Sequence, residues 1–217
     1  MGCDAATVES INRVHINERY LAGFELHPSL VATDDFDAAV TDSDLIIMGV
    51  PTRPSRDGPT SGRGRASVGA DRQSGQGFEE KTHLRMTQIL QEELPSRPVG
   101  VLTGPNLAKE ILGGQPAAAV IAMTEFHIAE RLQNLFTTDT FRVFLNHDVV
   151  GAGLGGALKN VYAVAVGSAE GRGLGNNTRA ALMTRGLAEL IELGTAMGAS
   201  RSPSPVSPAW AISSPRA

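Results

Sequence analysis

Cysteine is almost absent from this chain of 217 residues, which contains Cys3 and no other. One thiol cannot form an internal disulfide, so the sequence predicts a cytoplasmic protein. Nothing near Cys3 marks a base that would activate it, and we interpret this residue as incidental rather than as a nucleophile. The start of the chain also lacks the basic-then-apolar order of a secretion signal.

Long apolar runs and an excess of positive charge are missing as well. No stretch of about 18 or more apolar residues occurs, so no membrane span is expected. The formal net charge of −4 gives no electrostatic reason to expect nucleic acid as a partner. The histidines lack the i, i+4 spacing of a helical metal pair, and we expect no metal site.

Two segments contain few apolar side chains. Residues 53–77 are rich in Gly, Ser, Arg and Pro and have only Ala66, Val68 and Ala70 as apolar residues, and residues 199–217 are dominated by Ser and Pro. Neither segment can bury enough apolar surface to offset the entropy lost on ordering its chain. The composition therefore predicts that both segments are disordered.

The remaining sequence alternates short apolar runs with amphipathic stretches up to Asn146. This rhythm predicts an α/β fold in which helices cover a parallel sheet. The expected strands are 45–50, 99–102, 117–122 and 141–145, and the expected helices are 33–40, 81–94, 106–111 and 126–136.

The pattern changes after Asn146. Residues 157–166 and 178–197 predict two helices, separated by the glycine-rich stretch 167–175. We therefore expect a dinucleotide-binding type of domain over 1–146 and the start of an all-helical domain over 147–198.

Residues 151–156 match the pattern Gly-x-Gly-x-x-Gly. Such a loop can direct backbone N–H groups and a helix N-terminus at a pyrophosphate. However, the preceding strand is expected to end at Leu145, and no second strand ending in an acid follows. We favour the interpretation that these small residues permit close packing of a helix.

Lys159 stands among small and apolar neighbours. Burying a lysine on a crowded helix is costly unless its ammonium group is paired or used in acid–base chemistry. The alternative is a side chain whose stem lies along the surface while the ammonium group reaches water. Composition alone favours that alternative.

Two further motifs leave alternatives open. Gly104, Pro105 and Asn106 follow an expected strand, where Asn106 could cap the next helix and where ligands of open α/β sheets bind. Residues 171–179 combine flexible backbone with two arginines, which suits a phosphate site or an ordinary connection between helices.

Several of these segments resemble the NAD(P)-dependent glycerol-3-phosphate dehydrogenase family. The most specific similarity is Leu-Lys-Asn-Val at 158–161 together with Gly-Leu-Gly-Asn-Asn-Thr-Arg-Ala-Ala at 173–181. Members interconvert dihydroxyacetone phosphate and sn-glycerol 3-phosphate by hydride transfer, which supplies precursors of glycerophospholipids. The matching segments are 16–24, 32–36, 42–51, 102–110 and 155–194.

The resemblance implies roles for individual residues. Lys159 would be the proton acceptor or donor at the C2 oxygen of the substrate, which suits the chemistry of a dehydrogenase. Gly104 and Asn106, with Lys159, would contact the substrate, and Asn160 would be a supporting polar neighbour. A homodimer is the candidate assembly.

The resemblance also implies NAD or NADP as cofactor, with Pro51 and Ala108 in contact with it. Family members begin with a strand and a Gly-x-Gly-x-x-Gly turn that this sequence lacks, and Gln76 stands where they carry a lysine. These departures predict an incomplete Rossmann-like sheet, a truncated helical domain and no turnover.

Reading-frame shifts within 53–77 and after residue 198 would explain the loss of the family's sequence pattern in these two segments. The alternatives are a non-catalytic remnant of such an enzyme and a related hydroxy-acid dehydrogenase.

Overall fold

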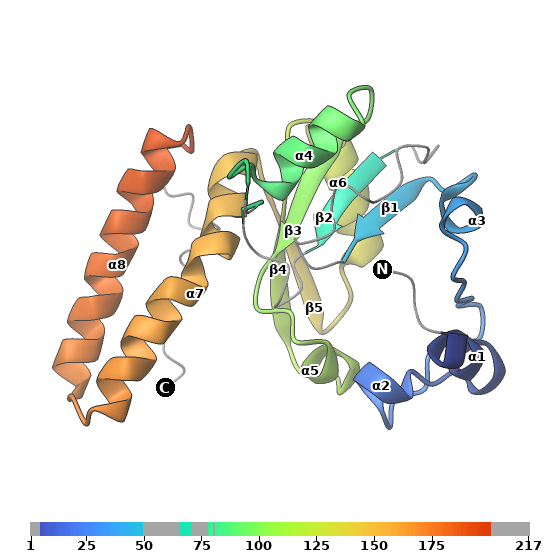
Figure 1. Cartoon of the computed structure of the whole chain (residues 1–217), viewed down its shortest axis with the longest axis horizontal. Coiled ribbons are helices and arrows are strands. Elements are labelled where there is room, and N and C mark those ends of the chain that lie inside the picture. The colour runs from blue at the N-terminus through green and yellow to red at the C-terminus, as the bar shows by residue number, and fades with distance from the viewer. Residues whose placement is uncertain (1–4, 50–65, 71–77, 80, 201–217) are drawn as a thin grey trace.

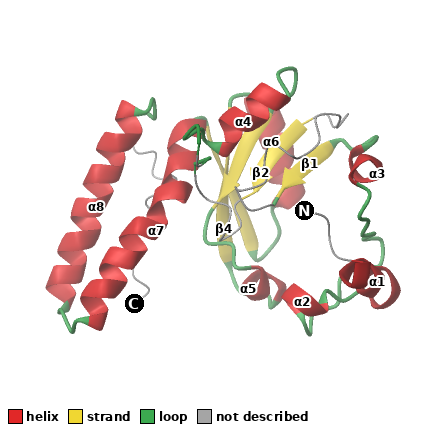
Figure 2. Ribbon diagram, in the orientation of Figure 1, coloured by secondary structure: helices red, strands yellow, loops and turns green. Residues whose placement is uncertain are grey.

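The computed structural model describes residues 5–49, 66–70, 78–79 and 81–200 of the chain. Figure 2 shows that the strands lie together and that helices surround them. The helices are α1 (Ala5–Val14), α2 (Glu18–Leu21), α3 (Phe36–Val40), α4 (Met86–Glu93), α5 (Ala108–Leu112), α6 (Phe126–Phe136), α7 (Val149–Gly171) and α8 (Asn176–Ala196). The strands are β1 (Leu45–Met48), β2 (Ala66–Ala70), β3 (Val99–Thr103), β4 (Ala117–Met123) and β5 (Phe141–Asn146).

The five strands form one sheet in the order β1-β2-β3-β4-β5 (Figure 1). Strands β1, β2 and β3 are parallel to one another, and β4 is parallel to β5. However, β4 runs antiparallel to β3, with Thr103 opposite Val120. The prediction of a wholly parallel sheet is therefore wrong at this one pairing, and the sheet is mixed.

Two glycines allow the close approach of β3 and β4. A Cβ atom on Gly100 would lie 2.9 Å from the carbonyl oxygen of Ala122, and one on Gly104 would lie 2.7 Å from that of Ala118. Real side chains do not tolerate such distances to backbone atoms. Glycine is therefore required where these two strands meet.

The sheet is covered on both faces. Helix α6 contacts β4 and β5 on one face, where Ala129 and Leu132 join the hydrophobic core. Helices α4 and α7 contact each other and β3, and α7 also contacts β4. Strand β4 is buried on both faces, because Ile121 and Ala122, which point in opposite directions, are both fully buried.

After Asn146 the described chain is helical. Helices α7 and α8 pack against each other as an antiparallel hairpin that extends away from the sheet (Figure 1). The ring of Tyr162 on α7 lies against the backbone of α8 at Gly186, where an added Cβ atom would overlap the ring. This contact fixes the spacing of the two helices.

The residues that follow α8 lie next to the residue that precedes α7. Asp148 is the N-cap of α7, and its Oδ1 accepts a hydrogen bond of 2.8 Å from the backbone N–H of Gly151. Its Oδ2 accepts one of 3.0 Å from the backbone N–H of Ser200. Ala199 N–H also donates to the carbonyl oxygen of Gly194, so the first two residues of the predicted disordered tail are ordered.

Three other local predictions need correction. Residues 66–70 form β2 between β1 and β3, although all of 53–77 was predicted to be disordered, and the rest of that segment lies outside the described residues. Asp35, rather than Thr33 or Asp34, caps α3. Helix α4 begins at Met86 rather than near 81, because His83 has a positive φ of 58° that no α-helix accommodates.

Helix α7 is longer and more apolar than expected. Among the described helices it alone has the length and composition of a membrane-crossing segment, with a mean hydropathy of 1.4. Its first turns are buried against the sheet at Ala152 and Leu154, while Val161 and Val164 farther along are exposed. It therefore serves as a core helix at one end and presents an apolar surface at the other.

The position of β2 predicts slow hydrogen exchange. Backbone amides of 66–70 that bond to β1 or β3 should exchange much more slowly than exposed amides, because β2 has a strand on each side. Native-state hydrogen exchange read by mass spectrometry would measure this protection. Exchange of 66–70 at the rate of an unstructured peptide would contradict the sheet order.

The Tyr162 contact predicts the effect of adding one methyl group. Gly186→Ala should lower the free energy of unfolding by about 1–3 kcal/mol, because the methyl group overlaps the Tyr162 ring. Gly167→Ala on α7 is the matched control, since its Cβ atom meets nothing within 4 Å. That change should be neutral or stabilising by up to about 1 kcal/mol, because alanine favours helix. Urea denaturation followed by circular dichroism would compare the two, and equal effects would refute the role of the contact.

Candidate functional site

One edge of the sheet brings together several strand ends. The parallel strands end there at Met48, Ala70 and Thr103, and β4 begins there at Ala117 because it runs in the opposite direction. Ligands of open α/β sheets bind outside the carboxyl ends of the strands. This edge is therefore the first candidate for a binding site.

The turn that follows β3 is shaped by Gly104. This residue is buried and has a φ of +157°, and its backbone lies directly against Ala118 and Ala119. The N–H of Asn106 donates to the Gly104 carbonyl oxygen at 3.0 Å, which closes the turn. The absence of a side chain at Gly104 thus lets the turn pass closely against the start of β4.

Asn106 does not have the predicted capping role. The N-cap of α5 is Leu107, which makes no side-chain capping bond. Within the described part of the chain, the half-buried side chain of Asn106 makes no hydrogen bond. Its amide therefore has donors and an acceptor available for a ligand.

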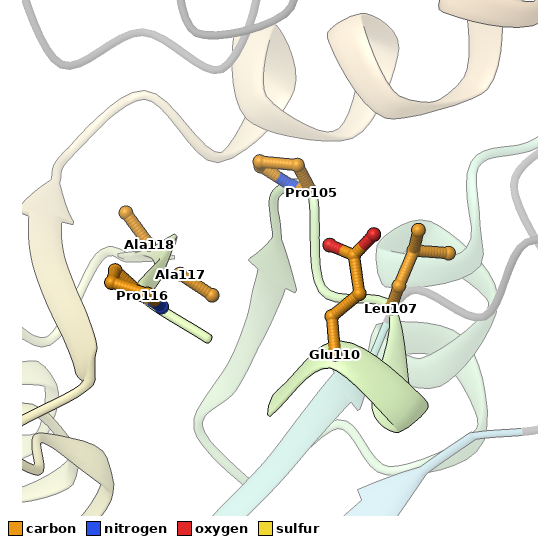
Figure 3. A pocket seen from close by; sticks show the side chains of 6 residues that line it. All are labelled: Pro105, Leu107, Glu110, Pro116, Ala117 and Ala118. Atoms are coloured by element: carbon orange, nitrogen blue, oxygen red, sulfur yellow. The ribbon is translucent and has the colours of Figure 1, made fainter. Parts of the chain in front are cut away.

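A pocket of about 550 Å³, named here the edge pocket, lies beside this turn (Figure 3). Its volume is in the range of small-ligand sites. Ala108, the predicted cofactor contact, is exposed at the start of α5 but does not line the pocket. The lining residues are Pro105, Leu107 and Glu110 on one side and Pro116, Ala117 and Ala118 on the other.

Lys159 lies at a second pocket, between α7 and α8. It is half-buried, and the pocket has a volume of about 320 Å³. Asn160, next along α7, is exposed and does not line it. The lining residues are Gly155, Lys159, Tyr162, Ala163, Val166, Gly167 and Glu170 from α7, and Met183, Leu187 and Leu190 from α8. We call this the hairpin pocket.

Tyr162 shares the hairpin pocket with Lys159 one helical turn away. Burial of its ring raises the pKa of Tyr162 above the ordinary value, and the negative charge of Glu189 raises it further. The phenol is therefore neutral at physiological pH and can donate a hydrogen bond. Tyr162 gives no signal of function in the sequence, because one aromatic residue in an apolar helix is typical of packing.

One of the two arginines of residues 171–179, Arg179 in the first turn of α8, is engaged within the protein. Arg179 Nη1 donates to Glu170 Oε1 at 2.8 Å, and Arg179 also bonds to Asn176. Glu170 in turn lines the hairpin pocket. This ion pair favours the interpretation of 171–179 as an interhelical connection over a phosphate site.

The half-buried Arg85 supports the start of α7 from another part of the chain. Its side chain lies 3.9 Å from the position of a Cβ atom on Gly153, and Nη1 donates to Thr87 Oγ1 at 3.2 Å. Burial lowers the pKa of Arg85 from its usual range, and the charge of Asp148 opposes this shift. This cluster holds α7 in place at its buried end.

Residues 151–156 are part of α7 rather than a loop. Gly155 and Gly156 are buried in the helix where it meets the sheet. Their N–H groups bond within the helix and cannot surround a pyrophosphate, so the packing interpretation of this motif is correct.

The predicted site residues thus fall into two groups. Gly104, Asn106 and Ala108 lie together between β3 and α5, whereas Lys159 and Asn160 lie on α7. The two pockets have no lining residue in common. They are linked through α7, which packs on β3 and carries Lys159. The remaining predicted cofactor contact, Pro51, lies outside the described residues.

Comparison with known families gives two matches along the chain. The profile of the NAD-dependent glycerol-3-phosphate dehydrogenase N-terminus matches residues 1–129. The profile of the NAD-dependent glycerol-3-phosphate dehydrogenase C-terminus matches residues 148–208. The second match begins one residue before α7, and β5 lies between the two matches.

Curated relatives agree with these profiles. Glycerol-3-phosphate dehydrogenase [NAD(P)+] 2 of Sphingopyxis alaskensis is 47% identical over 90% of this chain and 59% of its own length. Glycerol-3-phosphate dehydrogenase [NAD(P)+] of Mycobacterium avium is 45% identical over 89% of this chain and 58% of its own length. The chain therefore spans less than two thirds of the length of these relatives.

Solved structures share the fold. The glycerol-3-phosphate dehydrogenase of Coxiella burnetii superposes with a TM-score of 0.81 at 27% identity, covering 91% of this chain and 61% of that one. The Saccharomyces cerevisiae enzyme gives a TM-score of 0.80 at 28% identity, covering 95% of this chain and 63% of that one.

The environment of Tyr162 predicts how its phenol titrates. In Tyr20→Phe, which leaves one tyrosine, phenolate absorbance should appear at a pH clearly above about 10. Glu189→Gln should bring this midpoint partly back, since burial remains. Because the folded hairpin favours the neutral phenol, the free energy of unfolding should fall as the pH rises above about 10. Titration at the ordinary tyrosine pH would refute the burial of this phenol.

Proposed function

This chain belongs to the NAD-dependent glycerol-3-phosphate dehydrogenase family, and we propose that its described residues form part of a site that interconverts dihydroxyacetone phosphate and sn-glycerol 3-phosphate. The cofactor of the family and of its relatives is NAD or NADP. The reaction moves a hydride between C2 of the substrate and the nicotinamide ring, so it also needs a group that exchanges a proton with the C2 oxygen.

The observation that carries this proposal is the place of Lys159. It is the sole basic residue among those that line the hairpin pocket, and it is half-buried there. Its neighbours in the pocket are mainly small or apolar, so the side chain lies in surroundings of low polarity. A lysine in such surroundings suits proton transfer better than a lysine on the open surface does.

The proposed role of Lys159 follows the direction of the reaction. When the C2 carbonyl group is reduced, the ammonium group donates a proton to the developing alkoxide. When the alcohol is oxidised, the neutral amine takes the proton of the C2 hydroxyl group. Lys159 therefore acts at the transition state more than in substrate binding.

Gly104 and Asn106 are proposed to contact the substrate from the edge of the sheet. Gly104 lets the turn pass closely against β4, and the half-buried Asn106 amide supplies donors beside it. Asn160 is proposed as a supporting polar neighbour of Lys159, and Ala108 and Pro51 as contacts of the dinucleotide.

A second candidate function is a non-catalytic remnant of such an enzyme. The separation of the edge pocket from the hairpin pocket favours it, because catalysis requires the hydride donor and Lys159 to meet at one substrate. The proposal also includes a cytoplasmic location and a homodimer. The exposed side chains of Val161 and Val164 on α7 provide apolar surface for association.

Replacement of Lys159 tests the proposal. If the parent chain has turnover, Lys159→Met should lower it by about 10²- to 10⁴-fold, because methionine keeps the length of the side chain but cannot exchange a proton. The Michaelis constant for dihydroxyacetone phosphate should change much less. Oxidation of NADH that depends on dihydroxyacetone phosphate provides the measurement.

Lys109→Met is the matched control, because Lys109 is exposed on α5 and lines neither pocket. It removes the same charge and should leave turnover nearly unchanged. Equal losses in the two variants would reject Lys159 as the proton-transfer group. Absence of substrate-dependent NADH oxidation in the parent chain would instead favour the remnant.

A further inference from the structure

The hairpin pocket is an apolar groove with a positive charge near one end and a negative charge at the other. Lys159 and Glu170, both on α7, are the two charged residues among those that line it. Helices α7 and α8 lie side by side and form its two walls (Figure 1). We propose that this groove binds a medium-chain fatty acid, with the carboxylate at Lys159 and the alkyl chain directed toward Glu170. This inference goes beyond the proposed reaction, because neither substrate nor cofactor contains an alkyl chain.

The walls of the groove suit an alkyl chain. Ala163 and Val166 come from α7, and Met183 and Leu187 come from α8. Val166, Met183 and Leu187 are half-buried, so part of their apolar surface is in contact with water. Methylene groups that cover these side chains remove apolar surface from water on both sides, and each one adds to the affinity. The volume of about 320 Å³ accommodates a single slender chain.

The polar side chains near one end of the groove suit a carboxylate. The ammonium group of Lys159 has three donors, so it can bond to a ligand carboxylate in addition to a partner within the protein. Tyr162, one helical turn away, lines the same groove, and its neutral phenol is a further donor. Hydrogen bonds from a charged donor to a carboxylate are stronger than those between neutral groups. The carboxylate is therefore directed to Lys159 and away from the negative charge of Glu170.

The spacing of the two charges sets a length for the ligand. Lys159 and Glu170 are eleven positions apart on α7, which is about 16 Å along the helix axis. An extended chain advances about 1.2 Å per bond, so about ten to twelve carbon atoms fill this distance. A longer chain would reach the exposed ion pair of Glu170 with Arg179 and then solvent. Fatty acids beyond this length should therefore gain little affinity from each added carbon atom.

Ligand-observed NMR of the full chain with a series of fatty acids tests the proposal without relying on turnover. From hexanoate to decanoate the dissociation constant should fall about two- to four-fold for each added carbon atom, and it should level off near dodecanoate. Lys159→Met should raise the dissociation constant of octanoate about ten-fold or more, because the charged donor is lost. For 1-octanol, which has the same chain without a charge, the same variant should change it less than about three-fold.

A matched pair of variants tests the position of the alkyl chain. Val166 lines the groove, whereas Val164 on the same helix is 69% exposed and does not line it. Val166→Asp should weaken octanoate binding about ten-fold or more, and Val164→Asp less than about two-fold, because only the first places a charge beside the chain. Far-UV circular dichroism checks that both variants remain helical. If Val166→Asp does not, the comparison of octanoate with 1-octanol in Lys159→Met decides.

Three outcomes would overturn the assignment. Equal losses for octanoate and 1-octanol in Lys159→Met would exclude the contact with the carboxylate. Equal losses in Val164→Asp and Val166→Asp would indicate adsorption on the outer apolar surface of α7 instead of binding in the groove. Affinity that keeps rising well beyond dodecanoate would show that Glu170 does not bound the site. Octanoate binding as expected in a chain without turnover would support the assignment and refute only the proposed reaction.

Discussion

Strands β3 and β4 lie side by side in opposite directions because Gly100 and Gly104 leave room for the carbonyl oxygens of Ala122 and Ala118. Their pairing joins the parallel strands β1 to β3 to the parallel pair β4 and β5, and no other pairing of the described strands connects these two parts. Helix α7 packs across both strands, and the edge pocket opens where β3 ends and β4 begins. The continuity of the sheet, the packing of α7 and the wall of the edge pocket thus all depend on the contact between the backbones of β3 and β4.

Patterns within a single element predicted the fold best. The bounds of α6 agree with its amphipathic period, because Ala129 and Leu132 fall on the face that meets the sheet. The direction of β4 was not predictable, since a strand buried on both faces looks alike when read either way. Strand β2 was missed because Ala-Ser-Val-Gly-Ala has little strand propensity, and the ladders on both sides supply its order.

The candidate site was predicted in parts. The resemblance to a family identified Lys159, and the position of Gly104 after a strand marked the turn. Glu110 gave no signal, because an acid near the start of a helix is usually explained by solvation and by the helix dipole. Its place in a pocket arises only when the chain returns from α5 to begin β4 beside it. Such long-range closure is not contained in local sequence patterns.

The two bonds of Asp148 have a consequence for how the helical part is attached. Because the carboxylate binds the N–H of Gly151 at the beginning of α7 and that of Ser200 just beyond α8, the two ends of the hairpin are held together at one side chain. A unit whose two ends coincide behaves as an insertion. A change in the length of the hairpin would therefore leave the strand positions unchanged, because both of its ends stay at Asp148.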